Sequence, residues 1–199
     1  MKVTIADYGV GNLHSLAKAL ERLGTQVKIS ADLGRLDDAD ALVLPGVGAY
    51  GNVMKQLEPV KHELIEFVDE KPVLGVCLGM ELLFEYSEES GGVTGLGLIP
   101  GRVERLVGVK VPHMGWNTVH HDQDPIFEGI DQDTHFYFVH SYAWKAEGEP
   151  TIAMTEYGGR FTAVVRIGNV YGTQFHPEKS SRAGLRLLEN FVRFAEAFG

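Results

Sequence analysis

Short apolar segments alternate with amphipathic segments through the first 90 residues, and this alternation limits the fold more than any other feature. The apolar segments are typical of buried strands and lie at 2–6, 26–30, 41–45 and 72–76. The amphipathic segments have apolar residues at helical spacing and lie at 12–24, 59–70 and 78–87. Asn12 is placed to cap the first helix and Gly24 to end it. Such alternation predicts right-handed βαβ units and a parallel sheet covered by helices on both faces.

The second half of the chain is richer in strand-like segments. These partly alternating segments lie at 99–106, 113–121, 135–145, 150–158 and 161–175, with a hairpin turn expected at 167–169. An amphipathic helix is predicted at 181–198. We therefore expect one α/β domain over residues 1–199, doubly wound, with a largely parallel central sheet flanked by helices and an antiparallel β extension before the last helix.

Composition excludes several classes of function. The 18 Lys and Arg residues face 27 Asp and Glu, which gives a net charge of −9, and no basic cluster suited to nucleic acid is visible. No apolar run reaches the roughly 18 residues of a membrane span, and the first residues lack the apolar core of a signal peptide. A cytoplasmic protein without a nucleic-acid or membrane partner is expected.

The only cysteine lies in the stretch GVCLG, residues 75–79. This G-x-C-x-G pattern is the thiol counterpart of the nucleophile elbow, a sharp strand-to-helix turn that presents a nucleophile at the carboxyl end of a strand. The following helix N-terminus is expected to lower the pKa of the Cys77 thiol. The alternative is a small, inert apolar residue on a core strand.

A candidate base lies in QFHPEKS, residues 174–180. His176 follows a predicted strand, and Glu178 is close enough in sequence to orient the imidazole ring if the chain bends at Pro177. The alternative is a loop histidine beside a solvated glutamate. The glycine-rich stretch at 44–51 is a possible oxyanion hole, although a phosphate-binding loop or an ordinary turn has the same pattern.

The motifs PGVGAYG, GVCLGM and FHPEKS, in this order, resemble the class I (triad) glutamine amidotransferases. DYGVGN, PHMGWN and FYFVHSY make the whole chain similar to the glutaminase subunits of imidazole glycerol phosphate synthase. The resemblance implies that Cys77 is the nucleophile, His176 the acid and base, and Glu178 the residue that orients His176. It also implies an oxyanion hole made by the N–H of Leu78 with that of Val47 or Gly48.

The resemblance further implies a glutamine-binding set, made up of Gly48, Glu81, Ser141 and Tyr142. Glu81 departs from the family, in which glutamine usually occupies this position. A carboxylate can accept from the substrate ammonium, but it repels the substrate carboxylate and opposes formation of the thiolate. The alternative is an outward-facing Glu81 that complements the helix N-terminus.

The implied partner is a (β/α)₈-barrel cyclase subunit, which receives ammonia in a heterodimer. The family positions that face this partner are Asn12, Trp116, Tyr137 and Lys179. From pattern alone, Trp116 and Tyr137 are equally well explained as core residues and Lys179 as a solvated charge. The resemblance implies no metal and no organic cofactor.

Other functions remain open at this point. One is the glutaminase subunit of another ammonia-channelling enzyme, such as pyridoxal phosphate synthase. Others are a peptidase or chaperone-like protein with a cysteine elbow, and an interaction module without activity. Turnover of glutamine separates these classes, because the silent module shows none and the peptidase does not require glutamine.

Overall fold

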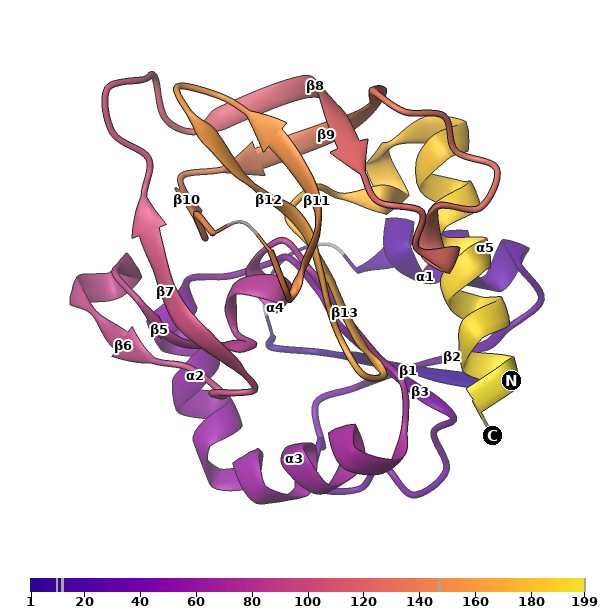
Figure 1. Ribbon diagram of the computed structural model, residues 1–199. Coiled ribbons are helices and arrows are strands. Elements are labelled where there is room, and N and C mark those ends of the chain that lie inside the picture. Colours follow the sequence, from indigo (N-terminus) through magenta and orange to yellow (C-terminus); the bar gives the residue numbers. More distant parts are fainter. Residues whose placement is uncertain (10, 12, 147, 199) are drawn as a thin grey trace.

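The computed structural model describes residues 1–198 except 10, 12 and 147, and its centre is a nine-stranded mixed sheet (Figure 1). Across the sheet the strands are β2 (Gln26–Ser30), β1 (Lys2–Ala6), β3 (Ala41–Leu44), β4 (Val73–Val76), β13 (Val170–Thr173), β12 (Arg160–Ile167), β11 (Thr151–Glu156), β8 (His113–His121) and β9 (Thr134–His140). Neighbouring strands from β2 to β13 are parallel, and those from β13 to β9 are antiparallel. The expected α/β architecture is therefore confirmed, and the antiparallel extension continues the same sheet.

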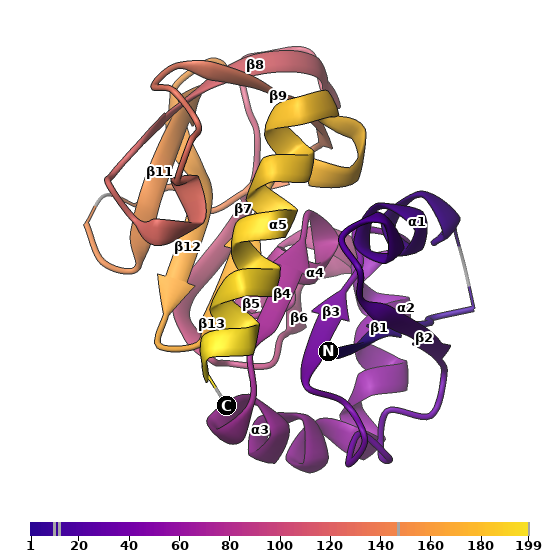
Figure 2. The same cartoon turned by 90° about the vertical axis from the view of Figure 1, so that its right-hand side faces the viewer.

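Helices cover both faces of the parallel half, because its strands are apolar on both sides (Figures 1 and 2). In β3, Ala41 and Val43 face α1 (His14–Arg22) and α5 (Ser181–Phe198) in one core. Leu42 and Leu44 face α2 (Tyr50–Leu57) and α3 (Lys61–Glu70) in the other core. Helix α3 is preceded by the 3₁₀ turn η1 (Glu58–Val60). Helix α2 was not predicted from the sequence, since Gly51 lies within it.

The predicted helix over 78–87 is wrong. Only α4 (Leu78–Glu81) is helical, and β5 (Phe84–Ser87) follows it. The aromatic segment of β5 pairs with β6 (Val93–Thr94) and β7 (Ile99–Arg105), and β10 (Tyr142–Ala143) completes this second sheet. Strand pairing has overridden the helical pattern, as it commonly does for short apolar runs.

The strand predicted over 135–145 divides at Ser141 into two strands of different sheets. Strand β9 ends at His140 and lies in the nine-stranded sheet, whereas β10 begins at Tyr142 and pairs with β7. The turn at 167–169 is confirmed, with Gly168 at φ 55° between β12 and β13. The capping role expected of Asn12 lies outside the described residues. Three further 3₁₀ turns are η2 (Glu89–Gly91), η3 (Pro125–Phe127) and η4 (Pro177–Lys179).

Candidate active site

The site lies where three adjacent parallel strands end. Strands β3, β4 and β13 are neighbours in the sheet, with Leu44 opposite Gly75 and Thr173 opposite Val76. The chain leaving β3 enters the glycine-rich loop, the chain leaving β4 reaches Cys77, and the chain leaving β13 reaches His176. Carboxyl ends of parallel strands are where open α/β sheets bind ligands.

Cys77 occupies a strained turn between β4 and α4. Its φ of 49° and ψ of −107° lie in a region that a side chain rarely adopts. The two flanking glycines allow this turn, because a Cβ at Gly75 would approach the Gly79 carbonyl oxygen to 2.6 Å, and a Cβ at Gly79 would collide with the Leu44 carbonyl. The geometry is that of a nucleophile elbow.

Gly46 lies between the two residues expected to react. A Cβ built at Gly46 would be 2.7 Å from the Cys77 Cβ and 2.9 Å from the His176 Cε1. The His176 Nδ1 is in turn 2.9 Å from Oε1 of Glu178, and the side chains of both are almost fully buried. The structure thus brings together the thiol, the imidazole and the carboxylate in the order that an acyl-transfer triad requires.

The Cys77 thiol is buried and lies near hydrogen-bonding groups of both kinds and near two carboxylates. Its Sγ lies 3.6 Å from the Val139 carbonyl oxygen, to which it donates, and 3.9 Å from the Gln174 Nε2. Burial raises the pKa of the thiol well above its ordinary value, and Glu81 raises it further, while the Leu78 N–H acts in the opposite direction. The expected lowering of the Cys77 pKa is therefore wrong, because desolvation raises this pKa more than the N-terminus of α4 lowers it.

Glu81 faces inward, next to the thiol. It is 4% exposed, and its Oε1 accepts a hydrogen bond of 2.9 Å from the Gln174 Nε2. Burial raises the pKa of Glu81 to about 8, partly offset by the Gln174 hydrogen bond. The outward-facing alternative is wrong, and the side chain is mostly a neutral carboxylic acid at neutral pH.

The remaining sequence-predicted residues follow groups at the site along the chain, Val47 and Gly48 after Gly46, and Ser141 and Tyr142 after Val139. Gly48 is exposed with φ 103°, and Val47 packs against Gly11, where a built Cβ would be 2.5 Å from the Val47 Cβ. Ser141 lies at the break between β9 and β10, and its carbonyl accepts from the Leu106 N–H at 2.9 Å. The Tyr142 carbonyl oxygen lies 2.7 Å from the His140 Nδ1.

An exposed aromatic surface lies on the outer face of β8 and β9. Trp116 is 52% exposed, and its ring meets that of Tyr137 edge-on, with the centroids 6.0 Å apart. The core interpretation of Trp116 is thus wrong, and the half-buried Tyr137 connects this surface to the site, because its carbonyl accepts from the His176 N–H at 2.9 Å. Lys179 is exposed on η4. Asn12 lies outside the described residues.

Two neighbours of the thiol were not found by sequence reasoning. Gln174 is fully buried and contacts both Cys77 and Glu81. A signal existed, since Gln174 lies two residues before His176 in the same motif, although the chain bends at 174–175. The contact of the Val139 carbonyl with Cys77 could not be predicted, because every residue has a backbone carbonyl and the sequence does not distinguish this one. Among the described residues, no group of three or more His, Cys, Asp or Glu is arranged to hold a metal ion.

Comparison with known proteins agrees with this geometry. The family model "Glutamine amidotransferase class-I" matches residues 4–194. The imidazole glycerol phosphate synthase subunit HisH of Methanothermobacter thermautotrophicus is 48% identical, over 98% of this chain and 100% of its own length. The chain belongs to the HisH family of class I glutamine amidotransferases. The HisH subunit of Halobacterium salinarum is 50% identical to this HisH-family chain, over 96% of it and 93% of its own length.

Solved structures share the fold of this HisH-family chain at low sequence identity. A crystal structure of a glutamine amidotransferase superposes with a TM-score of 0.77 at 24% identity, covering 98% of both chains. The PurLQS structure from Thermotoga maritima gives 0.75 at 18% identity, over 97% of this chain and 98% of that chain. Within the described residues, every helix is too short or too polar to cross a lipid bilayer.

Proposed function

We propose that this HisH-family chain hydrolyses glutamine to glutamate and ammonia at Cys77 and supplies the ammonia to a synthase partner. The observation that carries this proposal is the triad, in which Cys77 and His176 both lie against Gly46 and Glu178 lies 2.9 Å from the His176 Nδ1. A glutamate on Nδ1 fixes the ring orientation and leaves Nε2 to exchange a proton with the thiol.

The first half of the reaction forms a thioester. His176 takes the proton from Cys77, and the sulfur attacks the side-chain carbonyl carbon of glutamine. The developing oxyanion is held by the Leu78 N–H together with an N–H of the Val47–Gly48 segment. Because burial raises the pKa of the resting thiol, the thiolate forms together with attack rather than beforehand. His176 then gives its proton to the departing nitrogen, which leaves as ammonia.

The second half releases glutamate. Water loses a proton to His176 and attacks the thioester carbonyl, and the sulfur leaves and regains the proton. Within the pocket, Glu81 and Gln174 form a buried polar pair beside the sulfur. We assign the α-ammonium of glutamine to Glu81, and the rest of the amino-acid group to Gly48, Ser141 and Tyr142.

The partner is proposed from the names of the relatives. They are subunits of imidazole glycerol phosphate synthase, and we infer a (β/α)₈-barrel cyclase that docks over Trp116, Tyr137, Lys179 and Asn12 in a cytoplasmic heterodimer. There ammonia would enter the synthesis of imidazole glycerol phosphate and aminoimidazole carboxamide ribotide, the histidine-pathway step. The exposed Trp116 and the hydrogen bond between Tyr137 and His176 support this docking side.

The test is Cys77→Ala in the complex reconstituted with the cyclase subunit. We expect loss of glutamine-dependent synthesis, since no nucleophile remains, with ammonia-dependent synthesis unchanged. The control is ammonium chloride at saturating concentration with the parent complex. Loss of both activities in an intact complex would give Cys77 a structural role and overturn the proposal.

A further inference from the structure

Two buried histidines form a hydrogen-bonded pair that the mechanism above does not use. His113 on β8 and His140 on β9 face each other in register and are 4% and 5% exposed. The His113 Nδ1 lies 3.0 Å from the His140 Nε2. A buried pair of this kind requires fixed donor and acceptor roles, because an unpaired ring nitrogen away from water is costly.

The direction of every hydrogen bond in the pair follows from one carbonyl. The Tyr142 carbonyl oxygen can only accept, so the His140 Nδ1, at 2.7 Å, carries the proton. The His140 Nε2 is then an acceptor for the His113 Nδ1–H. The His113 Nε2 in turn accepts from the Asn117 Nδ2 at 3.4 Å. Both rings are neutral, and burial lowers the pKa of His140 to about 3 and lowers that of His113 as well.

The chain segment held by this pair borders the thiol. On one side of His140, the Val139 carbonyl accepts from the Cys77 Sγ at 3.6 Å. On the other side, the His140 ring donates to the Tyr142 carbonyl and closes the turn through Ser141, where the chain passes from one sheet to the other. The side chains of His113 and His140 therefore help to hold the backbone of 139–142 next to Cys77, together with the pairing of β9 with β8 and of β10 with β7.

We propose that His140, held by His113, is a positioning residue that fixes Ser141 and Tyr142 for glutamine beside Cys77. This inference rests on the proposed glutaminase function. It also places the positioning residue on the two strands that carry Trp116 and Tyr137, so that the exposed aromatic surface and the substrate-binding turn share one hydrogen-bonded unit.

Simple core packing is the competing explanation, and phenylalanine tests it. The His113 ring stacks on Tyr157 at 4.1 Å between centroids and on Phe138 at 5.0 Å. A phenyl ring preserves such stacking but removes both ring nitrogens. If packing were the whole role, His113→Phe and His140→Phe would leave glutamine binding unchanged.

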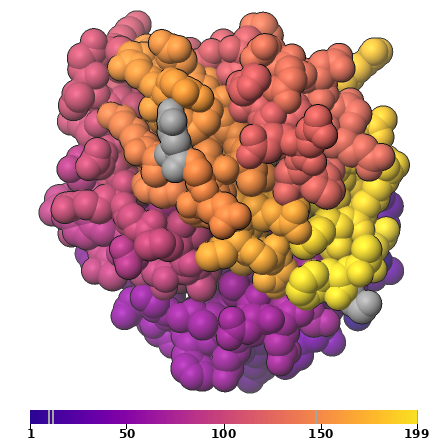
Figure 3. All heavy atoms as spheres, viewed as in Figure 1, coloured from indigo at the N-terminus to yellow at the C-terminus, as the bar shows by residue number. Residues whose placement is uncertain are grey.

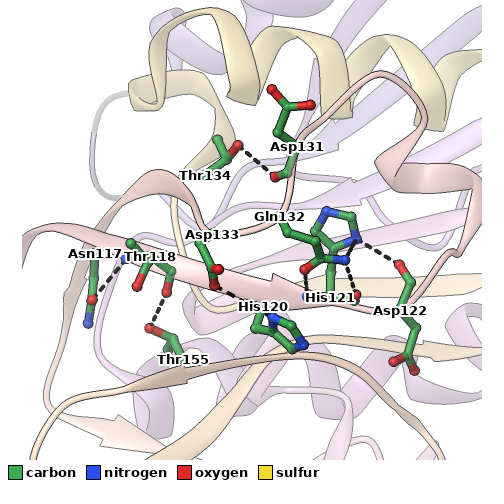
Figure 4. A network of polar contacts seen from close by, with 10 residues as sticks. All are labelled: Asn117, Thr118, His120, His121, Asp122, Asp131, Gln132, Asp133, Thr134 and Thr155. Carbon is green, nitrogen blue, oxygen red and sulfur yellow. Dashed lines mark hydrogen bonds and ion pairs between the residues drawn. The ribbon is translucent and has the colours of Figure 1, made fainter.

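A matched control lies farther along the same strand. His121 is also buried and stacks on Phe127 at 4.1 Å, and its Nδ1 donates to the Asp122 carbonyl at 2.7 Å (Figure 4). Gln132, drawn beside it in Figure 4, lies just before β9 in the chain, and its Nε2 donates to the His121 carbonyl oxygen. His121→Phe therefore removes an equally buried ring N–H without touching the turn at Ser141.

The first experiment measures the tautomers of the full chain. Long-range ¹H–¹⁵N spectra should show His113 and His140 protonated on Nδ1 only, which is the less common tautomer in water, and neutral at pH 7. Protonation of either ring on Nε2 would overturn the arrangement, whether or not the chain hydrolyses glutamine. This readout thus separates failure of the inference from failure of the proposed function.

The second experiment uses the reconstituted synthase. His140→Phe and His113→Phe should raise the KM for glutamine about tenfold or more, with a smaller change in kcat and unchanged ammonia-dependent synthesis. Labelling of Cys77 by a diazoketone analogue of glutamine should slow equally, while labelling by iodoacetamide should not. His140→Asn, whose amide nitrogen replaces Nδ1, should restore most of the affinity. An unchanged KM, or the same change in His121→Phe, would overturn the proposal.

Discussion

The parallel and antiparallel halves of the nine-stranded sheet contribute different things to the site. The parallel half, from β2 to β13, ends in Gly46, Cys77 and the segment leading to His176. The antiparallel half carries Trp116 and Tyr137 on its outer face and the His113–His140 pair on its inner face. In Figure 3 this half and its loops, pink to orange, cover the upper part of the visible face, above the purple helical region.

The two halves are joined where β13 pairs with β12, and they meet a second time along the outer edge of β9. Strand β9 is last in the sheet, so one of its edges has no strand partner among the residues that the structure describes. That edge accepts from the His176 N–H through Tyr137 and from the Cys77 Sγ through Val139. The groups proposed to react therefore come from strand ends in one half, and part of their surroundings comes from the strand edge of the other half.

Gly46→Ala should have the largest effect, because it acts where the reacting groups meet. The added Cβ would be 2.7 Å from the Val76 carbonyl oxygen and equally close to the Cys77 Cβ. We expect kcat/KM for glutamine to fall by about 10²–10³, comparable to the loss of an oxyanion donor. Gly34→Ala is the control, since its Cβ would be 3.6 Å from the nearest atom. Equal activity of both variants would show that the parallel half tolerates rearrangement at its strand ends.

Trp116→Ala tests the antiparallel half. Adding the cyclase subunit and its acceptor ligand to the parent chain should raise glutamine hydrolysis by orders of magnitude. The variant should lose about tenfold or more of that stimulation, because exposed tryptophans are frequent interface hot spots. Ile29→Ala, which removes a 40% exposed side chain on the opposite edge strand β2, is the control. A high rate in the isolated parent chain, unchanged by partner, would refute coupling between the halves.

Glu81 allows a finer test within the parallel half. Glu81→Gln should retain activity and lower the KM for glutamine severalfold near and above pH 8, where Glu81 is ionised in the parent, repels the substrate carboxylate and raises the pKa of Cys77. Glu81→Ala should raise the KM, because it removes the partner proposed for the substrate ammonium. The KM is measured between pH 6 and 9 in the complex. Two variants indistinguishable from the parent would show that Glu81 makes no contact with substrate.

The pH dependence of the stability of Glu81→Gln tests the burial of this side chain without any measurement of activity. Burial raises the pKa of Glu81 from its ordinary value of 4.5, which applies to the unfolded chain, to about 8 in the folded chain. The folded chain therefore holds a proton that the unfolded chain has lost, and the parent loses stability as pH rises between these values. The variant should match the parent near pH 4 and exceed it by up to roughly 4 kcal/mol at pH 9. Urea unfolding at both pH values measures this difference, and a constant difference would contradict the shift.

The sequence by itself predicted the alternating strands and helices of the parallel half, apart from α2, and the residues proposed to react. Apolar runs before Cys77 and His176 predicted strands that end at both, and the G-x-C-x-G spacing predicted the strained turn now seen at φ 49°. These signals are local, because strand burial and turn geometry depend on neighbouring residues. The helix predicted over 78–87 was wrong because the local pattern does not contain the later strands with which its aromatic segment pairs.

Tertiary structure alone decided the surroundings of those residues. The inward position of Glu81 depends on Gln174, which lies 93 residues later, and the pairing of His113 with His140 joins residues 27 apart. The raised pKa of the Cys77 thiol is due first to burial in the folded chain. The sequence pattern is equally compatible with a buried Trp116, and the position of β8 in the sheet decides that this side chain is exposed. Desolvation and hydrogen-bond direction are properties of a packed environment, and no single segment of sequence contains that environment.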